Sequence, residues 1–216
     1  MVDSALADQY IDPTRQALAR VASFCKTTSF ELIEEHRTSC GLTPLHETLL
    51  GINQSYSGLE QHLQWLRRDG SLSELIDEPD FRGRTALAWA VEYGMADAVR
   101  TLLNFGSNPC QYRTSDRSRT PMLHLAIAGP PPPLESGLFE VVKMFLATDI
   151  DINARDEEGW TAFHIASSWR SYDILHEIMR THFYYVDIAG KTNLDELADD
   201  LSQDADFYPK LLMNTY

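Results

Sequence analysis

Thr43-Pro44-Leu45-His46 is a tetrapeptide that returns four more times, in altered form, along this chain of 216 residues. The later copies are Thr85-Ala86-Leu87-Ala88, Pro121-Met122-Leu123-His124, Thr161-Ala162-Phe163-His164 and Thr192-Asn193-Leu194-Asp195. A glycine precedes four of the five copies by two residues, and in three of them an aspartate stands three residues before that glycine. This recurrence predicts a protein built from stacked structural repeats.

Each copy contains residues that favour a tight turn followed by a helix. An aspartate side chain can accept a hydrogen bond from the backbone two residues on, and glycine adopts a positive φ without steric cost. Threonine then caps the helix, and proline fits its first turn. A second helix follows, with an apolar stripe at the spacing of one buried face; its clearest copy is Leu138, Val141, Val142, Phe145 and Leu146.

This succession of a turn and two helices resembles the ankyrin-repeat family, most fully over residues 151–166. The resemblance implies an all-α fold, a solenoid of stacked helix-turn-helix units with short β-turn hairpins. We predict a helical N-terminal cap over residues 1–36 and four repeats over residues 37–186. A degenerate fifth repeat and an acidic C-terminal cap are expected over residues 187–216.

Two polar or proline-rich stretches interrupt the pattern as insertions, at residues 52–58 and 129–136. The second contains four consecutive prolines, which cannot continue a helix and favour extended polyproline. Such a stretch could be a docking peptide for an SH3 or WW domain. We favour a stiff spacer between two helices, because a short proline motif is weak support for docking.

The composition bounds the class of protein. A net charge of −14 argues against nucleic-acid binding, which needs a basic surface. No apolar run has the length of a membrane span, and the N-terminus lacks the pattern of a secretory signal. The odd number of cysteines without metal-ligand spacing favours reduced thiols and a cytoplasmic location, with the nucleus as the alternative.

Three histidines, His46, His124 and His164, occupy the same position in their repeats. Equivalent residues of stacked helices lie about 10 Å apart, which is too far for a shared metal ion. The resemblance instead implies structural histidines that bond the backbone of a turn. No nucleophile–base motif and no phosphate-binding glycine loop is found. We therefore expect no catalytic residues, no metal site and no cofactor, and we predict that the chain is not an enzyme.

The resemblance also implies where a partner is contacted, namely at the hairpin tips and the exposed ends of the first helices. Aromatic and arginine side chains most often dominate binding energy. For Trp160 and Trp169 the alternative that the two indoles pack on each other, or on a loop, stays open. The predicted partner-binding residues are Phe81, Arg82, Arg84, Tyr93, Arg117, Glu157, Trp160, Trp169 and Lys191.

These observations predict a protein–protein interaction module, an adaptor that binds a partner segment on the concave face of the solenoid. We expect the chain to be a monomer, although the acidic cap could mediate self-association. The alternative function is a small-molecule-binding protein, or an unusual enzyme, that uses the same aromatic-lined groove.

Overall fold

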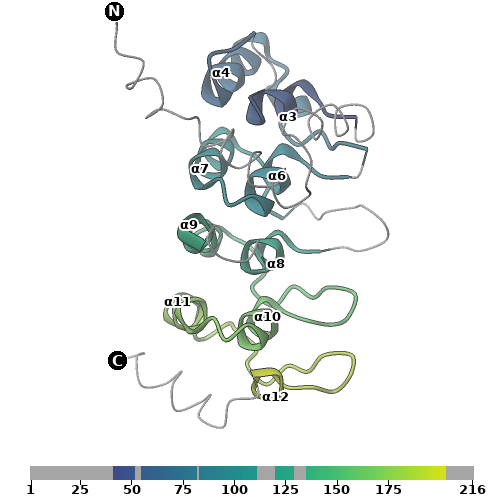
Figure 1. The fold of residues 1–216 in the computed structure, drawn as a ribbon, viewed down its shortest axis with the longest axis vertical. Coiled ribbons are helices and arrows are strands. Elements are labelled where there is room, and N and C mark those ends of the chain that lie inside the picture. The colour runs from purple at the N-terminus through teal and green to yellow at the C-terminus, as the bar shows by residue number, and fades with distance from the viewer. Residues whose placement is uncertain (1–40, 52–54, 82, 111–119, 129–134, 203–216) are drawn as a thin grey trace, which may run out of the picture. The chain divides into compact units, whose positions relative to one another are not determined.

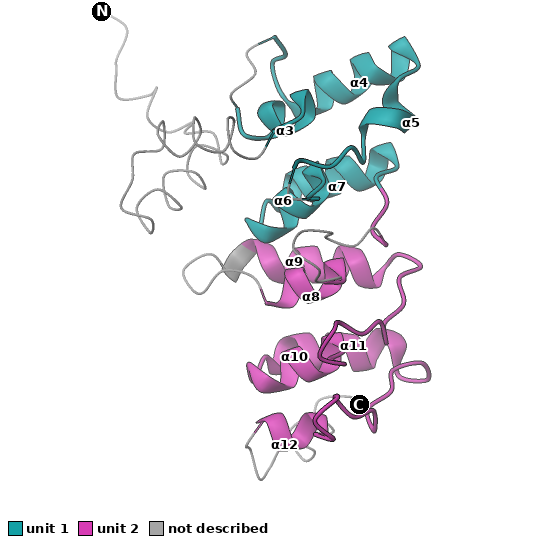
Figure 2. Cartoon of the chain, turned by 90° about the vertical axis from the view of Figure 1, so that its right-hand side faces the viewer, with its two compact units in different colours: residues 1–107 teal, residues 108–216 magenta. Residues whose placement is uncertain are grey.

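The computed structural model describes residues 41–51, 55–81, 83–110, 120–128 and 135–202 (Figure 1). The predicted N-terminal cap, the four prolines, and the predicted contact residues Arg82 and Arg117 lie outside them. The chain divides into two compact units, residues 1–107 and 108–216, which Figure 2 shows in different colours. The predicted boundaries after residues 36 and 186 stay predictions.

The first unit consists of helix pairs joined by turns. Its helices are α3 (Pro44–Leu49), α4 (Leu59–Asp69), α5 (Leu72–Leu75), α6 (Ala86–Glu92) and α7 (Ala96–Phe105). Helix α3 packs against α4, and α6 packs against α7. Helix α3 also contacts α6, and α4 contacts α7, so that one pair stacks on the next. The stacking follows from the apolar stripes, because no single pair can bury its own stripe.

The second unit repeats this construction. Its helices are α8 (Met122–Ile127), α9 (Glu135–Leu146), α10 (Ala162–Ser168), α11 (Tyr172–His182) and α12 (Ala198–Ser202). Helix α8 packs against α9, α10 packs against α11, and α10 contacts both α8 and α12. The turns before α10 and α12 project on the side of α8 and α10, away from α9 and α11 (Figure 1). The two described turns of this unit thus lie on the same side.

Threonine caps the first helix of a pair, as predicted. The side chains of Thr43, Thr85 and Thr161 each accept a hydrogen bond from the backbone N–H three residues on. All three have the extended backbone that an N-cap requires. Helix α8 differs, because Pro121 stands at this position and makes no capping hydrogen bond through its side chain.

The core lies along the predicted stripes. All five members of the stripe over residues 138–146 are buried, and Trp89 is only 1% exposed. Trp65, by contrast, is 48% exposed. The buried face of α4 contains Leu63 and Leu66, and Trp65 falls off that face. Its ring instead lies beside that of Tyr56, with the ring centroids 6.0 Å apart.

The glycine before the fifth copy has a different role from the one predicted. The glycines of the first, second and fourth copies have a positive φ, as the turn pattern requires, whereas Gly190 does not. A Cβ on Gly190 would lie 2.7 Å from Asp187 Oδ2 and 3.0 Å from Arg155 Nη2. At this position glycine therefore provides space for two neighbouring side chains.

The helices of both units are short. Helix α9 has 12 residues, and the first helices of the pairs have six or seven. Within the described ranges, no helix combines the length and the apolar character that crossing a bilayer would need.

Candidate functional site

The hairpin turn at residues 156–161 has a geometry that follows from its sequence. Asp156 Oδ1 accepts hydrogen bonds from the backbone N–H groups of Glu158 (3.1 Å) and Trp160 (2.8 Å). Gly159 has a φ of 78°, in the left-handed region that favours glycine. The Asp156 N–H donates to the Trp160 carbonyl oxygen (3.1 Å) and closes the turn. The backbone of the hairpin tip is therefore held in one conformation.

A histidine connects the following helix to the next turn. His164 Nδ1 lies 2.7 Å from Thr161 Oγ1, and its Nε2 lies 2.9 Å from the Gly190 carbonyl oxygen. Because a carbonyl oxygen can only accept, Nε2 carries the proton and Nδ1 accepts from the threonine hydroxyl. His46 repeats this arrangement, with Nε2 3.0 Å from the Arg84 carbonyl oxygen. The prediction that these histidines bond the turn backbone is confirmed.

The third histidine of this series lacks its capping partner. His124 Nε2 bonds the Ala154 carbonyl oxygen (3.1 Å), but Pro121 offers neither a hydroxyl nor a backbone N–H to Nδ1. Among the described residues, His124 Nδ1 has no hydrogen-bond partner, and Asp156 Oδ2 lies 3.9 Å away. Burial lowers the pKa of His124 to about 4. The ring is therefore neutral at pH 7, and the contact with Asp156 is not an ion pair.

The three histidines serve separate turns. Burial also lowers the pKa of His46 and of His164, which favours the neutral imidazole in both. Each Nε2 donates to a different carbonyl oxygen, so the rings do not converge. In the part of the chain that the structure describes, no group of three or more histidine, cysteine, aspartate or glutamate side chains could hold a metal ion.

Asn193 connects the turn at residues 192–196 to the tip of the 156–161 hairpin by two hydrogen bonds. Its backbone N–H donates to the Glu158 carbonyl oxygen (2.9 Å), and its Nδ2 donates to the Glu157 carbonyl oxygen (2.7 Å). A Cβ on Gly159 would lie 2.5 Å from Asn193 Oδ1 and 2.9 Å from its backbone nitrogen. The absence of a side chain at Gly159 thus permits the two turns to meet.

Leu194 is exposed although it occupies a repeat position that is buried elsewhere. The equivalent side chains of the other four copies are at most 4% exposed, whereas Leu194 is 78% exposed. The Thr192 N–H donates to the Glu196 carbonyl oxygen (3.0 Å), and Asp195 has a φ of 66°. A tight turn therefore replaces the expected start of a helix, and α12 begins only at Ala198.

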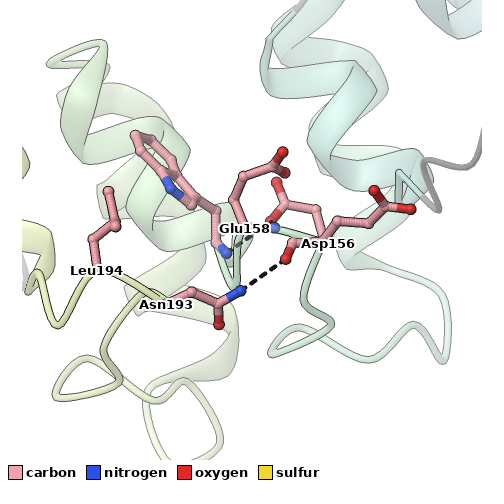
Figure 3. A pocket seen from close by; sticks show the side chains of 6 residues that line it. Asp156, Glu158, Asn193 and Leu194 are labelled. Atoms are coloured by element: carbon pink, nitrogen blue, oxygen red, sulfur yellow. Dashed lines mark hydrogen bonds between the residues drawn. The ribbon is translucent and has the colours of Figure 1, made fainter.

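An open cavity of about 610 Å³ lies between these two turns (Figure 3). We call it the hairpin hollow. In Figure 3 the Asp156 and Glu158 side chains lie on one side of it and Leu194 lies on the other. Trp160 is partly buried and contributes its indole. The hollow is lined by Asp156, Glu157, Glu158, Trp160, Asn193 and Leu194.

The cations near the hairpin hollow are bound to other groups. Lys191 Nζ lies 2.8 Å from Asp195 Oδ1, and Arg155 Nη1 donates to two backbone carbonyl oxygens (2.9 and 2.5 Å). Glu157 and Glu158 are exposed, and neither forms an ion pair with a described residue. One side of the hollow therefore carries three carboxylates, and neither cation forms an ion pair with them.

In the corresponding hairpin of the first unit, residues 80–85, the side chain before the threonine belongs to Arg84 and points inward. Arg84 is 3% exposed, and both its Nε and its Nη2 lie 3.0 Å from Asp80 Oδ2. Its guanidinium lies 4.0 Å from the ring centroid of Trp89, whose Nε1 donates to the same oxygen (3.0 Å). Burial alone would raise the pKa of Asp80, but the contacts with Arg84 and Trp89 outweigh it and lower that pKa. Arg84 was predicted to face a partner and is instead buried in this network.

The other predicted contact residues differ in exposure. Phe81 is 83% exposed and Trp169 is 55% exposed, whereas Tyr93 is partly buried with its ring centroid 5.4 Å from that of Trp89. Among the described aromatic residues, no ring contact joins Trp160 to Trp169. The two indoles therefore do not pack on each other, which was one of the two alternatives left open by the sequence.

Two groups of exposed apolar side chains were not predicted. Leu194 was missed because the repeat pattern assigns it to a helix. Phe183, Tyr184 and Tyr185, at the end of α11, are 52%, 91% and 74% exposed. Their turn is held by Asn153, whose Nδ2 donates to the Tyr185 carbonyl oxygen (2.6 Å). Three consecutive aromatic residues directly after an amphipathic helix are the signal that could have found this second group.

Comparison with known proteins agrees with the repeat architecture. A family model described as ankyrin repeats (3 copies) matches residues 18–156, which is more than half of the chain. A putative ankyrin repeat protein, L371, of Acanthamoeba polyphaga mimivirus is 29% identical over 135 residues, covering 62% of this chain and 15% of that protein. Inversin of Gallus gallus is 32% identical over 99 residues, covering 46% of this chain and 8% of inversin.

A third relative is the glycerophosphocholine phosphodiesterase gde1 of Schizosaccharomyces pombe. It is 35% identical over 105 residues, covering 49% of this chain and 8% of that enzyme. In all three relatives the similarity thus spans a small part of a much longer protein. The family match covers most of the chain, and the structure contains the turns, caps and paired helices of the repeat. The chain belongs to the ankyrin-repeat family.

Proposed function

We propose that this chain is a protein-interaction module that binds a segment of a partner protein at the hairpin hollow. Ankyrin repeats generally mediate interactions between proteins. The observation that carries the proposal is the exposed Leu194 beside the Trp160 indole, on two turns that Asn193 holds together. A leucine exposed at a position that is otherwise buried is available to a partner.

The backbone of the hollow favours binding because it is already ordered. Asn193 bonds two carbonyl groups of the neighbouring tip, and Asp156 bonds two N–H groups within that tip. Preorganised turns lose little conformational entropy when a partner binds. A tryptophan in such a position is the residue type that most often dominates interface energy.

The proposed surface extends along the hairpins within each unit. In the second unit we include Glu157, Trp160, Trp169 and Lys191 from the sequence prediction. In the first unit we include Phe81 and Tyr93. The buried Arg84 is left out, while Arg82 and Arg117 lie outside the described residues and remain predictions from the sequence.

The proposal includes the expectations from composition. We expect a cytoplasmic, monomeric module that performs no catalysis and does not bind nucleic acid, since its net charge of −14 would repel phosphate groups. Sedimentation of the purified chain at several concentrations tests the monomer. A sedimentation coefficient that rises with concentration would contradict it.

The test of the proposal is affinity capture by the immobilised chain, with quantitative mass spectrometry of the captured proteins. Leu194→Ser removes exposed apolar surface without touching the core, so the folded state should be retained. We expect the captured amount of at least one protein to fall about tenfold, which corresponds to about 1.4 kcal/mol of binding free energy. Trp160→Ala should have the larger effect, and thermal unfolding checks that this variant is folded.

Tyr184→Ser is the matched control, because Tyr184 is 91% exposed in the same unit and does not line the hollow. Its captured proteins should equal those of the unmodified chain. If capture is lost with Tyr184→Ser and retained with both hollow variants, the interaction surface lies at the end of α11 instead.

A small-molecule function has one observation in its favour, since about 610 Å³ falls within the usual range of ligand pockets. The cavity is open, however, and Trp160 and Leu194 are the only large apolar side chains among its lining residues. Native mass spectrometry of the purified chain discriminates the two functions. A bound small molecule that is absent from the Trp160→Ala variant would favour the alternative.

A further inference from the structure

The two sides of the hairpin hollow differ in chemistry. Trp160 and Leu194 form an apolar side, and Asp156, Glu157 and Glu158 form an acidic side. Figure 3 shows Leu194 apart from the Asp156 and Glu158 carboxylates, with Asn193 between the two turns. A ligand that fills the hollow therefore meets an indole, an aliphatic side chain and carboxylates within one cavity.

The carboxylates on the acidic side are not equivalent. Asp156 Oδ1 is occupied by two backbone N–H groups of its own turn. Glu157 and Glu158 stand at the tip, exposed, and their backbone carbonyl oxygens rather than their side chains hold Asn193. Their carboxylates are thus available to a ligand.

The nearby cations do not neutralise this side. Lys191 is paired with Asp195 at 2.8 Å, and Arg155 donates to two backbone carbonyl oxygens. Arg155 also lies 3.9 Å from Asp187, another carboxylate. These two cations are outnumbered by the carboxylates at and around the hollow, so its net charge is negative, as is that of the whole chain at −14.

We infer that the hairpin hollow selects a basic partner segment, in which a lysine or arginine stands next to a large apolar residue. The inference rests on the function proposed above and names the chemistry of its partner. The apolar residue packs against Leu194 and one face of the Trp160 indole. The cation lies between the indole and the Glu157 and Glu158 carboxylates, where cation–π attraction and ion pairing act together.

An acidic segment is disfavoured at the same place. It would bring carboxylates against Glu157 and Glu158 at contact distance, where like charges repel. A neutral apolar segment would leave both glutamates unpaired at the rim and would bind without dependence on salt. Charge complementarity therefore distinguishes the three classes of partner.

Selection from a displayed library of short random peptides on the immobilised full chain tests this inference. Peptides retained by the unmodified chain and lost on Leu194→Ser and on Trp160→Ala define the ligands of the hollow. We expect them to be enriched in lysine or arginine adjacent to leucine, isoleucine, methionine or an aromatic residue. Circular dichroism and thermal unfolding verify that both variants are folded.

The tightest synthetic peptide from this selection is then titrated against charge variants. The double variant Glu157→Gln, Glu158→Gln should weaken its binding about tenfold and should largely remove the dependence of affinity on salt. The matched control is Glu74→Gln, Glu78→Gln, which removes two exposed carboxylates from the first unit. That control should change the affinity less than twofold.

The possible results separate the two proposals. If no selected peptide is lost on the Leu194→Ser and Trp160→Ala variants, the hollow is not an interaction surface, and both the proposed function and this inference fail. If peptides are lost on those variants but are acidic or neutral, only the inference about a basic segment fails. The same conclusion follows if their binding is unchanged in the Glu157→Gln, Glu158→Gln variant.

Discussion

The hairpins at residues 80–85 and 156–161 have the same pattern, Asp-x-x-Gly-x-Thr, and use the residue before the threonine in opposite ways. In both, the first aspartate Oδ1 accepts from the N–H four residues on, at 2.9 Å for Arg84 and 2.8 Å for Trp160. The Arg84 side chain then returns to its own aspartate and is buried. The Trp160 side chain lines an open cavity.

A third residue accounts for the difference. Trp89 donates its Nε1–H to Asp80 and lies beneath the Arg84 guanidinium, so the arginine is held between the aspartate and the indole. At the position of Trp89 the second unit has Ile165, which cannot donate. The shared pattern determines the turn, and the surrounding residues decide whether the side chain before the threonine is buried in the fold or lines an open cavity.

The largest predicted effect breaks the buried network of the first unit. Arg84→Ala leaves the Asp80 side chain, which is 0% exposed, without its guanidinium. Removing one member of a buried ion pair costs about 3 to 5 kcal/mol. We expect urea denaturation to show this loss in the free energy of unfolding. A loss below about 1 kcal/mol would mean that Arg84 is not part of the core.

The second prediction concerns His124, which lies beside Asp156 of the second hairpin and is neutral at pH 7. The pKa of His124 is about 4 in the folded state, below its value of about 6.5 in the unfolded chain. The unfolded state therefore binds this proton first as the pH falls, and His124 lowers the free energy of unfolding by about 3 kcal/mol between pH 7 and pH 4. The difference in free energy of unfolding between the unmodified chain and His124→Gln, measured by urea denaturation, should change by this amount between pH 7 and pH 4.

The control for that measurement is His182→Gln, at a partly exposed histidine of the same unit. A difference that stays constant with pH for His124→Gln would contradict the assigned neutral, buried ring.

The third prediction compares Gly159 with Gly41, two glycines that each lie close to a residue of the next turn. At Gly159 a Cβ would meet the Asn193 backbone nitrogen at 2.9 Å, whereas at Gly41 the three nearest atoms all belong to the Phe81 ring, at 2.6 Å. Both have a positive φ, which costs a non-glycine residue about 1 kcal/mol or more. The exposed Phe81 ring can rotate away, but the Asn193 backbone cannot. We expect Gly159→Ala to cost about 2 to 3 kcal/mol and Gly41→Ala about 1 kcal/mol in thermal unfolding. Equal costs would contradict a close contact between the two turns of the second unit.

The smallest predicted effect concerns the cap of α10. Thr161→Ala removes the hydroxyl that caps this helix and bonds His164 Nδ1, which then keeps only the backbone N–H of residue 161, at 3.2 Å, as a donor. The loss of an N-cap and a buried hydrogen bond is about 1 to 2 kcal/mol. Thr161→Ser keeps the hydroxyl and should cost less than half as much by urea denaturation. If the serine variant loses as much stability as the alanine variant, the hydroxyl is not the stabilising group.

Much of the fold could be predicted because its signals are local. The capping threonines, the stripe over residues 138–146 and the histidine positions depend on residues within a few turns of chain. The inward direction of Arg84 could not be predicted, because it requires Asp80 and Trp89 to meet across a folded turn and helix. The exposure of Leu194 could not be predicted either, because a tight turn over residues 192–196 competes with the helix that the repeat pattern favours.

The candidate site therefore depends on departures from the repeat. Trp160 and Glu157 were predicted from their positions in the pattern. The cavity that they line also needs Leu194 and Asn193, from a repeat whose first helix does not form at the usual place. Irregular repeats of this kind deserve inspection for exposed residues at positions that are normally buried.

The most direct test of the central claim is an NMR titration of the ¹⁵N-labelled chain with the tightest peptide selected on it. The indole N–H signals of Trp89 and Trp160 report the two hairpins in one spectrum, once each is assigned by a Trp→Phe variant. We predict that the Trp160 indole and the Asn193 and Leu194 amides shift in saturable fashion, while the Trp89 indole does not. Saturation with an unchanged Trp160 signal would contradict the account.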